Sequence, residues 1–213
     1  MTGFGNLSNL KTGDIMLFKS KPNNPIGILD AIIRFFTRSD FVHIGMILKN
    51  PSFIDNPLKG LYLWESSWEG TPDPNDGKIK LGVQITPISQ ILQDYSNKEN
   101  GEIYIRQVHC NSNNFSNENL LNIYKIVHNK IYDIELQDWV EALVKKDPFP
   151  QKTDRFWCSA LVGYIYTKCG LLNENTDWSI LRPSDFSESK QNLKFNNKNI
   201  FLEKQFKLNY ENV

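Results

Sequence analysis

Three side chains that are far apart in the sequence could act together on an acyl group. Cys158 lies in the stretch FWCSAL, where a helical pattern begins, and a helix amino end favours the thiolate form that attacks a carbonyl carbon. His43 lies in FVHIGMILK and Glu65 lies in LYLWESSW, and both stretches have the composition of β-strands. A nucleophilic cysteine, a histidine beside it and an acid that orients the imidazole are the parts that cysteine hydrolases use.

Each of these residues also has a simpler structural explanation. A free cysteine is commonly buried as a small hydrophobic residue, and a histidine in a strand is commonly a core residue with one nitrogen satisfied. A carboxylate in a strand usually faces water, so Glu65 alone indicates little. Cys169 is a weaker nucleophile candidate than Cys158, because it lies on the apolar stripe near the far end of the same predicted helix. The three residues are informative as a set.

The sequence does not indicate a metal or cofactor site. His, Glu and Cys can all bind zinc, but the chain contains no Cys-x-x-Cys, His-x-x-x-His or similar short spacing. Phosphate-binding loops and dinucleotide fingerprints are missing as well. The 24 Lys and Arg residues balance the 24 Asp and Glu residues, so the charge does not indicate a nucleic-acid partner. We therefore expect no metal, no cofactor and no nucleic-acid partner.

Alternation within the His43 strand predicts which way the imidazole points. Val42, Ile44, Met46 and Leu48 share one fully apolar face, so His43 points to the other face. Gly45 lies two residues further along the His43 face and carries no side chain. We expect the space beside the imidazole to admit a ligand or another backbone segment.

Strands and helices are both expected. The predicted strands, from short apolar or alternating runs, are 14–18, 41–50, 61–68 and 102–108, and residues 80–95 are predicted to be a strand end followed by a short helix. The other predicted helices, from apolar residues at helical spacing, are 24–38, 116–131, 135–146 and 158–169. Ser116 or Asn117 can cap one helix, and Gly170 can end the last one. Residues 1–213 are predicted to form one domain, because no composition shift marks a boundary.

Cellular location is predicted from the cysteines and the apolar stretches. The first residues do not have the pattern of a signal peptide, and the apolar stretch PIGILDAIIRFF is too short and too interrupted to cross a bilayer. Three cysteines form an odd set, which favours a reducing, cytoplasmic environment. Abundant Asn, Lys and Ile are typical of AT-rich genomes, including those of large DNA viruses. For a viral protein, the expected location is the virion or the host cytoplasm.

The order of short motifs along the chain is similar to that of a known family. The motifs are TGDIMLF, SDFVHIGMIL, LYLWES, GVQITPI, IYIRQV, KIYD, FWCSALVGYIY and LRPSDF, and they cover residues 13–186. In this order they resemble the circularly permuted branch of the NlpC/P60 superfamily, the YiiX-like papain-fold cysteine hydrolases, which includes bacterial proteins and poxvirus relatives. In that branch the histidine strand precedes the cysteine helix, as it does here.

The resemblance implies a fold and a set of site residues. The implied fold is α+β and permuted papain-like, with an antiparallel sheet packed against helices and the cysteine at a helix N-terminus. Matching the motifs residue by residue makes Cys158, His43 and Glu65 the catalytic triad. About two dozen residues separate the Tyr-Asp pair of KIYD from Cys158, which weakens any inference about substrate. Five further residues are expected to bind substrate or to support the triad: Asp14, Tyr132, Asp133, Trp157 and Ser159.

The resemblance implies a thiol peptidase or amidase that cleaves an amide bond, peptide or isopeptide-like, through a thioester intermediate. A lipid acyl hydrolase or acyltransferase, similar to lecithin retinol acyltransferase, is the alternative. A binding module that keeps the fold without turnover is a third possibility, because a fold does not decide a function. The expected partner is therefore a peptide or a lipid-type acyl substrate, and the sequence does not indicate an oligomeric state.

Overall fold

The structure is a computed structural model, and we describe its residues 7–20, 41–98, 101–132, 153–190 and 192–209. The helices predicted at 24–38 and 135–146 lie outside the described residues. Within these residues the fold is α+β, with a mostly antiparallel sheet and three α-helices. This confirms the α+β class that the sequence predicts.

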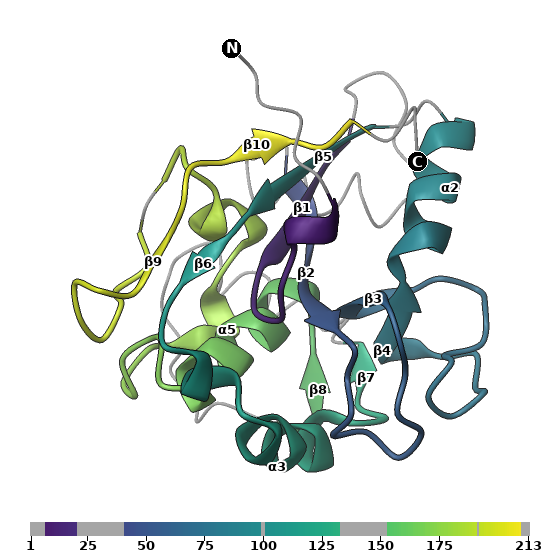
Figure 1. Cartoon of the computed structure of the whole chain (residues 1–213), viewed down its shortest axis with the longest axis horizontal. Helices are drawn as coiled ribbons and strands as arrows, with labels where there is room; N and C mark the ends of the chain where they lie inside the picture. The colour runs from purple at the N-terminus through teal and green to yellow at the C-terminus, as the bar shows by residue number, and fades with distance from the viewer. Residues whose placement is uncertain (1–6, 21–40, 99–100, 133–152, 191, 210–213) are drawn as a thin grey trace.

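The main sheet has eight strands within the described residues, in the order β10-β5-β1-β2-β3-β4-β7-β8 (Figure 1). Neighbouring strands are antiparallel except for β7 and β8, which are parallel. The strand bounds are β1 Ile15–Ser20, β2 Phe41–Lys49, β3 Leu61–Trp68, β4 Leu81–Pro87, β5 Gly101–Arg106, β7 Ile131–Tyr132, β8 Arg155–Phe156 and β10 Phe206–Lys207. A second, two-stranded sheet pairs β6 Val108–His109 with β9 Phe201–Leu202.

Local signals in the sequence mark the start of α3 and the end of α5. The α-helices are α2 Ile88–Lys98, α3 Asn117–Val127 and α5 Cys158–Lys168, and the short 3-10 helices are η1 Leu7–Asn9, η2 Ser112–Phe115, η3 Trp178–Ile180 and η4 Pro183–Phe186. Ser116 caps α3, because its side chain accepts a hydrogen bond from the Asn119 N–H. Gly170 follows α5 with φ at 72°, a conformation that favours glycine. The expectation that α3 continues to Ile131 is wrong, since Asn129 turns the chain with φ at 59° and Ile131 begins β7.

Two hydrophobic clusters cover the two faces of the sheet. Ile44 and Met46 of β2 belong to the cluster that includes Leu161 of α5, whereas Ile47 belongs to the cluster that includes Ile91 of α2. In Figure 1, α2 and α5 accordingly lie on different sides of the central strands. This confirms the predicted alternation of β2, in which His43 points away from the Ile44 face.

The ladder between β2 and β3 covers only part of each strand. It joins Met46–Lys49 to Leu61–Trp64. The half of β2 that carries His43 pairs with β1, and the half of β3 that carries Glu65 pairs with β4. Helix α5 contacts both β2 and β3. His43 and Glu65 therefore lie on strand halves that do not pair with each other, and their side chains are able to meet between them.

The space beside His43 is used by the protein itself. A Cβ atom added to Gly45 would lie 2.5 Å from Cγ of Leu63, which is fully buried on the neighbouring strand. Glycine at this position lets the Leu63 side chain pack over β2. The expectation that Gly45 leaves room for a ligand is therefore wrong, because close packing between β2 and β3 fills that room.

Candidate active site

Helix α5 begins at Cys158, whose residue is 3% exposed. The N-cap residue, Trp157, makes no side-chain capping bond, and the N–H groups of a helix's first turn have no acceptor within the helix. Cys158 is held close to β3, because Ser66 Oγ donates a hydrogen bond to the Phe156 carbonyl at 2.6 Å. Phe156 is fully buried. The thiol thus lies at a helix amino end that is attached to the sheet by β8.

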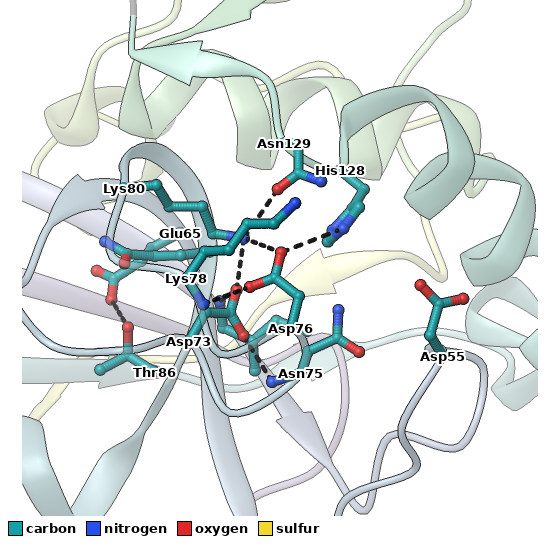
Figure 2. Close-up of polar contacts among 12 residues, drawn as sticks. Asp55, Glu65, Asp73, Asn75, Asp76, Lys78, Lys80, Thr86, His128 and Asn129 are labelled. Carbon is teal, nitrogen blue, oxygen red and sulfur yellow. Dashed lines mark hydrogen bonds and ion pairs between the residues drawn. The ribbon is translucent and has the colours of Figure 1, made fainter.

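His43 and Glu65 form a short hydrogen bond between β2 and β3. Nε2 of His43 lies 2.6 Å from Oε2 of Glu65, with the side chains 19% and 1% exposed. The Phe18 ring of β1 packs against the imidazole, with ring centroids 5.2 Å apart. The other oxygen of Glu65, Oε1, accepts a hydrogen bond from Thr86 Oγ1 at 2.6 Å, as Figure 2 shows. Both oxygens of this buried carboxylate are therefore engaged.

The imidazole of His43, which is hydrogen-bonded to Glu65, also lies close enough to Cys158 for the cysteine to act on its pKa. Burial acts to lower the pKa of His43, but hydrogen bonds and charge interactions with Cys158 and Glu65 outweigh it and raise this pKa well above its ordinary value. Because Nε2 faces Glu65, Nδ1 is the nitrogen that remains for the thiol. The structure thus brings together the three side chains that the sequence singled out.

The other two cysteines are in less reactive surroundings. Burial raises the pKa of Cys169 to about 12, and burial also raises the pKa of Cys110. A raised pKa keeps a thiol protonated at neutral pH, and the thiol form is a poor nucleophile. The surroundings of these two cysteines therefore favour Cys158 as the nucleophile.

A second carboxylate lies near the three residues and was missed in the sequence. Ser67 Oγ donates a hydrogen bond to Glu69, and Gln84 Nε2 donates to Ser67 Oγ at 3.2 Å. The pKa of Glu69 is raised to about 7, chiefly because the negative charge of Glu65 is near, with burial as the next cause. The alternation Glu65-x-Ser67-x-Glu69 was the available signal, since every second residue of a strand shares a face.

Replacing Glu69 with glutamine is expected to change how stability depends on pH. Between about pH 4.5 and 7 the folded protein keeps a proton on Glu69 that the unfolded chain releases, so the wild type loses stability as pH rises through this range. The E69Q variant has no carboxyl group to titrate at this position, so this decrease in stability with pH does not occur in it. We expect its free energy of unfolding, relative to wild type, to rise by about 1 to 2 kcal/mol between pH 4 and 8, allowing for solvent screening.

Urea unfolding at pH 4 and pH 8 measures this difference. Glu102 offers a control of opposite sign, because hydrogen bonds from Lys207 and Tyr104 lower its pKa. Glu102→Gln should lose stability relative to wild type as pH rises, since its carboxylate stabilises the fold only when ionised. A difference between E69Q and wild type that stays constant with pH would contradict the interaction between Glu69 and Glu65.

Asp14 lies outside the site. Its carboxylate accepts hydrogen bonds from the N–H groups of Lys11 and Val108, at 2.9 and 3.0 Å. The adjacent Gly13 carbonyl accepts a hydrogen bond from Tyr166 Oη at 2.6 Å. Tyr166 lies eight positions after Cys158 on α5, about 12 Å along the helix axis. The structure therefore places Asp14 at the other end of α5, where it holds the start of β1, rather than in support of the triad.

The remaining predicted residues surround the start of α5. Tyr132 is buried on β7 and pairs with Phe156 of β8, so it helps to place the segment that leads to Cys158. Ser159 Oγ donates a hydrogen bond to the Leu181 carbonyl at 2.7 Å, which attaches α5 to the segment after η3. Trp157 is partly buried directly before Cys158. Asp133 lies outside the described residues.

A polar network organises the loop between β3 and β4 (Figure 2). Nζ of Lys80 lies 2.9 Å from Oδ2 of Asp73 and 3.0 Å from Oδ2 of Asp76. Asp73 also accepts a hydrogen bond from the Ile85 N–H at 3.1 Å, and Nε2 of His128 lies 3.4 Å from Oδ2 of Asp76. The ammonium group of Lys80 thus occupies the centre of the acidic side chains. The network fixes the loop to β4 and to the end of α3.

Among the described residues, no three His, Cys, Asp or Glu side chains are grouped so that they could hold a metal ion. The same part of the chain contains no helix that is both long and apolar enough to span a membrane. A comparison with models of known protein families finds no match to this chain, and a search of curated proteins finds none either. The site is therefore interpreted from its own geometry.

Proposed function

We propose that the protein is a cysteine hydrolase with a permuted papain-like fold of the NlpC/P60 type, and that it cleaves an amide bond. Cys158 is the nucleophile, His43 transfers the proton and Glu65 holds the imidazole. One observation carries the proposal: the imidazole of His43 is hydrogen-bonded to Glu65, at 2.6 Å, and lies close enough to the cysteine that begins α5 for that cysteine to raise its pKa. The histidine strand precedes the cysteine helix, which supports the permuted form.

In the first half of the reaction, the thiolate of Cys158 attacks the carbonyl carbon while His43 carries the proton as imidazolium. The oxyanion that forms accepts hydrogen bonds from N–H groups in the first turn of α5. His43 then gives its proton to the nitrogen of the leaving amine, and the carbon–nitrogen bond breaks. The products of this half are the free amine and a thioester on Cys158.

In the second half, water attacks the thioester and neutral His43 takes the water's proton. The carbon–sulfur bond breaks, the carboxylic acid leaves, and the thiolate–imidazolium pair is restored. Glu65 stabilises the imidazolium each time it forms and keeps Nε2 occupied, so Nδ1 stays directed at the sulfur. The raised pKa of His43 supports this role, because the imidazolium must persist next to the sulfur.

The same thioester chemistry would serve the lipid acyl hydrolase or acyltransferase that the sequence left open. A long apolar groove leading to Cys158 would favour that alternative. A cavity of about 250 Å³ within the described residues lies apart from Cys158 and does not bear on this choice. A binding module without turnover would be favoured by a His43 that cannot reach Cys158, and the influence of Cys158 on the pKa of His43 argues against it. The cavity is lined by Arg106, Asp185, Leu193, Phe195, Phe201 and Leu202.

The proposal predicts an acyl adduct on Cys158 during turnover. Wild-type protein should be mixed with activated peptide esters, peptide amides and long-chain acyl esters, quenched in acid, and digested for mass spectrometry. We expect peptidyl substrates to add their acyl mass to the peptide that contains Cys158. Cys158→Ala should lose the adduct completely, whereas Cys169→Ala should keep it, because burial holds Cys169 in its unreactive thiol form.

Other outcomes of this experiment are equally informative. An adduct formed by long-chain esters and not by peptidyl substrates would move the assignment to the lipid alternative. Adducts on Cys110 or Cys169 in place of Cys158 would contradict the nucleophile assignment. Failure of every substrate to acylate Cys158, in a protein whose fold is intact by circular dichroism, would favour the binding module.

A further inference from the structure

Thr86 is hydrogen-bonded to Glu65, although it is not itself a member of the proposed triad. It lies on β4 and is 3% exposed. Its hydroxyl is 2.6 Å from Oε1 of Glu65, while Oε2 of the same carboxylate is 2.6 Å from Nε2 of His43. A line of hydrogen bonds therefore runs from β4 through β3 to His43 of β2, and His43 in turn lies beside Cys158 of α5. Thr86 is the outermost member of that line.

The direction of the Thr86 hydrogen bond follows from its chemistry. An ionised carboxylate only accepts hydrogen bonds, so the threonine hydroxyl must donate to Glu65. The last torsion angle of a glutamate side chain is broad, which means that the rotamer of Glu65 does not itself decide which oxygen faces His43. Threonine is branched at Cβ and has few χ1 choices, so its hydroxyl is a comparatively rigid donor.

The backbone around Thr86 is fixed independently of the site. In the β3–β4 ladder, Thr86 pairs with Leu63 and Gln84 pairs with Glu65. Opposite residues of an antiparallel pair share a face, so Thr86 and Glu65 are diagonal neighbours on one face of the sheet. The register of β3 against β4 thus sets the distance between the hydroxyl and the carboxylate.

We infer that Thr86 is a positioning residue for the proposed reaction. It acts through Glu65: by binding Oε1 it keeps Oε2 directed at His43, and this hydrogen bond helps to hold the imidazolium beside Cys158. The consequence for turnover rests on the proposed function. The consequence for the protonation of His43 does not, because it depends only on the hydrogen bonds described.

Among the described residues, charged or titratable groups lie close to both the imidazole and the carboxylate. His43 faces Cys158 from α5 and Glu65 from β3, and Glu65 also lies near Glu69. Removing the hydroxyl leaves a buried carboxylate oxygen of Glu65 without its donor, which is costly. The carboxylate is then expected to rotate, and this change weakens its hold on the imidazolium.

The test compares Thr86→Val, which has nearly the shape of threonine but no hydroxyl, with Thr86→Ser, which keeps the hydroxyl. Thr167→Val is the matched control. Thr167 is also buried, and its hydroxyl donates to the Gly163 carbonyl within α5, about 13 Å along the helix from Cys158. The Thr167→Val variant therefore loses a buried threonine hydroxyl that makes no contact with the site.

The first readout is an NMR titration of His43. The chain has three histidines, so the His43 signal can be assigned with a single His43→Gln sample. We expect T86V to lower the pKa of His43 toward its ordinary value by roughly one pH unit, the effect of losing one hydrogen bond to a charged group. T86S and T167V should keep the raised pKa of the wild type.

The second readout is the rate of Cys158 acylation as a function of pH. We expect T86V to acylate about tenfold more slowly or worse, with the alkaline limb of its profile moved to lower pH because the imidazolium loses its proton more easily, while T86S restores most of the rate. T167V should match the wild-type rate even where its melting temperature is lower. A folded T86V protein with wild-type His43 titration and wild-type rate would overturn the inference. A wild type that never acylates would instead contradict the proposed function, and the His43 titration would still decide the link from Thr86.

Discussion

Replacing His43 with glutamine is expected to lower the rate of Cys158 acylation at pH 7 by at least about a hundredfold. Glutamine is polar, similar in length to histidine and able to hydrogen-bond to Glu65, so the fold and the surroundings of Glu65 should be preserved. Its amide cannot carry a proton between the sulfur, the leaving amine and water. Both the thiolate and the proton transfer are therefore lost together.

Single-turnover acylation followed by mass spectrometry measures this rate for wild type and H43Q. His109→Gln is the matched control, because His109 is exposed on β6, where its ring stacks on Phe201 with centroids 4.7 Å apart. It should leave the rate unchanged. A rate for H43Q within a few-fold of wild type would show that Cys158 does not depend on this imidazole, and the triad would then have to be abandoned.

Replacing Gly82 with alanine is expected to destabilise the fold by about 3 kcal/mol or more. Gly82 lies where β4 meets β7 and has φ at 147°, a conformation that other residues rarely adopt. An added Cβ would also collide with the Lys130 carbonyl and lie 2.9 Å from Cα of Ile131. The colliding atoms belong to the backbone, so they cannot move aside as a flexible side chain could.

The contact between Gly82 of β4 and β7 matters for the site, because β8 pairs with β7 and leads into Cys158. The Lys130 carbonyl accepts a hydrogen bond from the Val83 N–H at 2.9 Å, and the collision would break it. We therefore expect G82A to slow the acylation of Cys158 even below its unfolding temperature. The site would be disturbed through the backbone, with its three side chains unchanged.

Gly77→Ala is the matched control for the Gly82 prediction. Gly77 has φ at 71°, but an added Cβ would find no atom within 4 Å. Gly77→Ala should lower the free energy of unfolding only through backbone strain, by about 1 kcal/mol. Urea unfolding of the two variants at the same pH separates strain from collision. If G82A loses no more stability than G77A, the close approach of β7 to β4 is not present in solution.

Several features of the fold could be predicted from local sequence. A strand buries every second residue and a helix every third or fourth, so β2, β3 and α5 have patterns that can be recognised within about ten residues. Capping residues mark ends in the same local way, as Ser116 does for α3. The position of Cys158 at the start of a helix was predictable from the helical spacing of the apolar residues that follow it.

Other features depend on residues that meet only in the folded chain. The two-residue strands β7 and β8 have no local pattern, because their parallel pairing is decided by the strands beside them. Gly45 was misinterpreted because its neighbour, Leu63, comes from another strand. Glu69 is 26 positions from His43 in the sequence, and only the arrangement of β2 and β3 brings their charges into interaction.

The sequence by itself determined which residue types are present, which face of each strand they occupy and that a cysteine begins a helix, because these follow from short-range periodicity. Only the tertiary structure decided that β2 and β3 part beside His43, that α5 contacts both strands, and that Thr86 supports Glu65 from β4. Strand register and helix placement result from packing between distant segments. A shift of one residue in that register would turn Glu65 to the other face of the sheet, although the sequence of every strand would be the same.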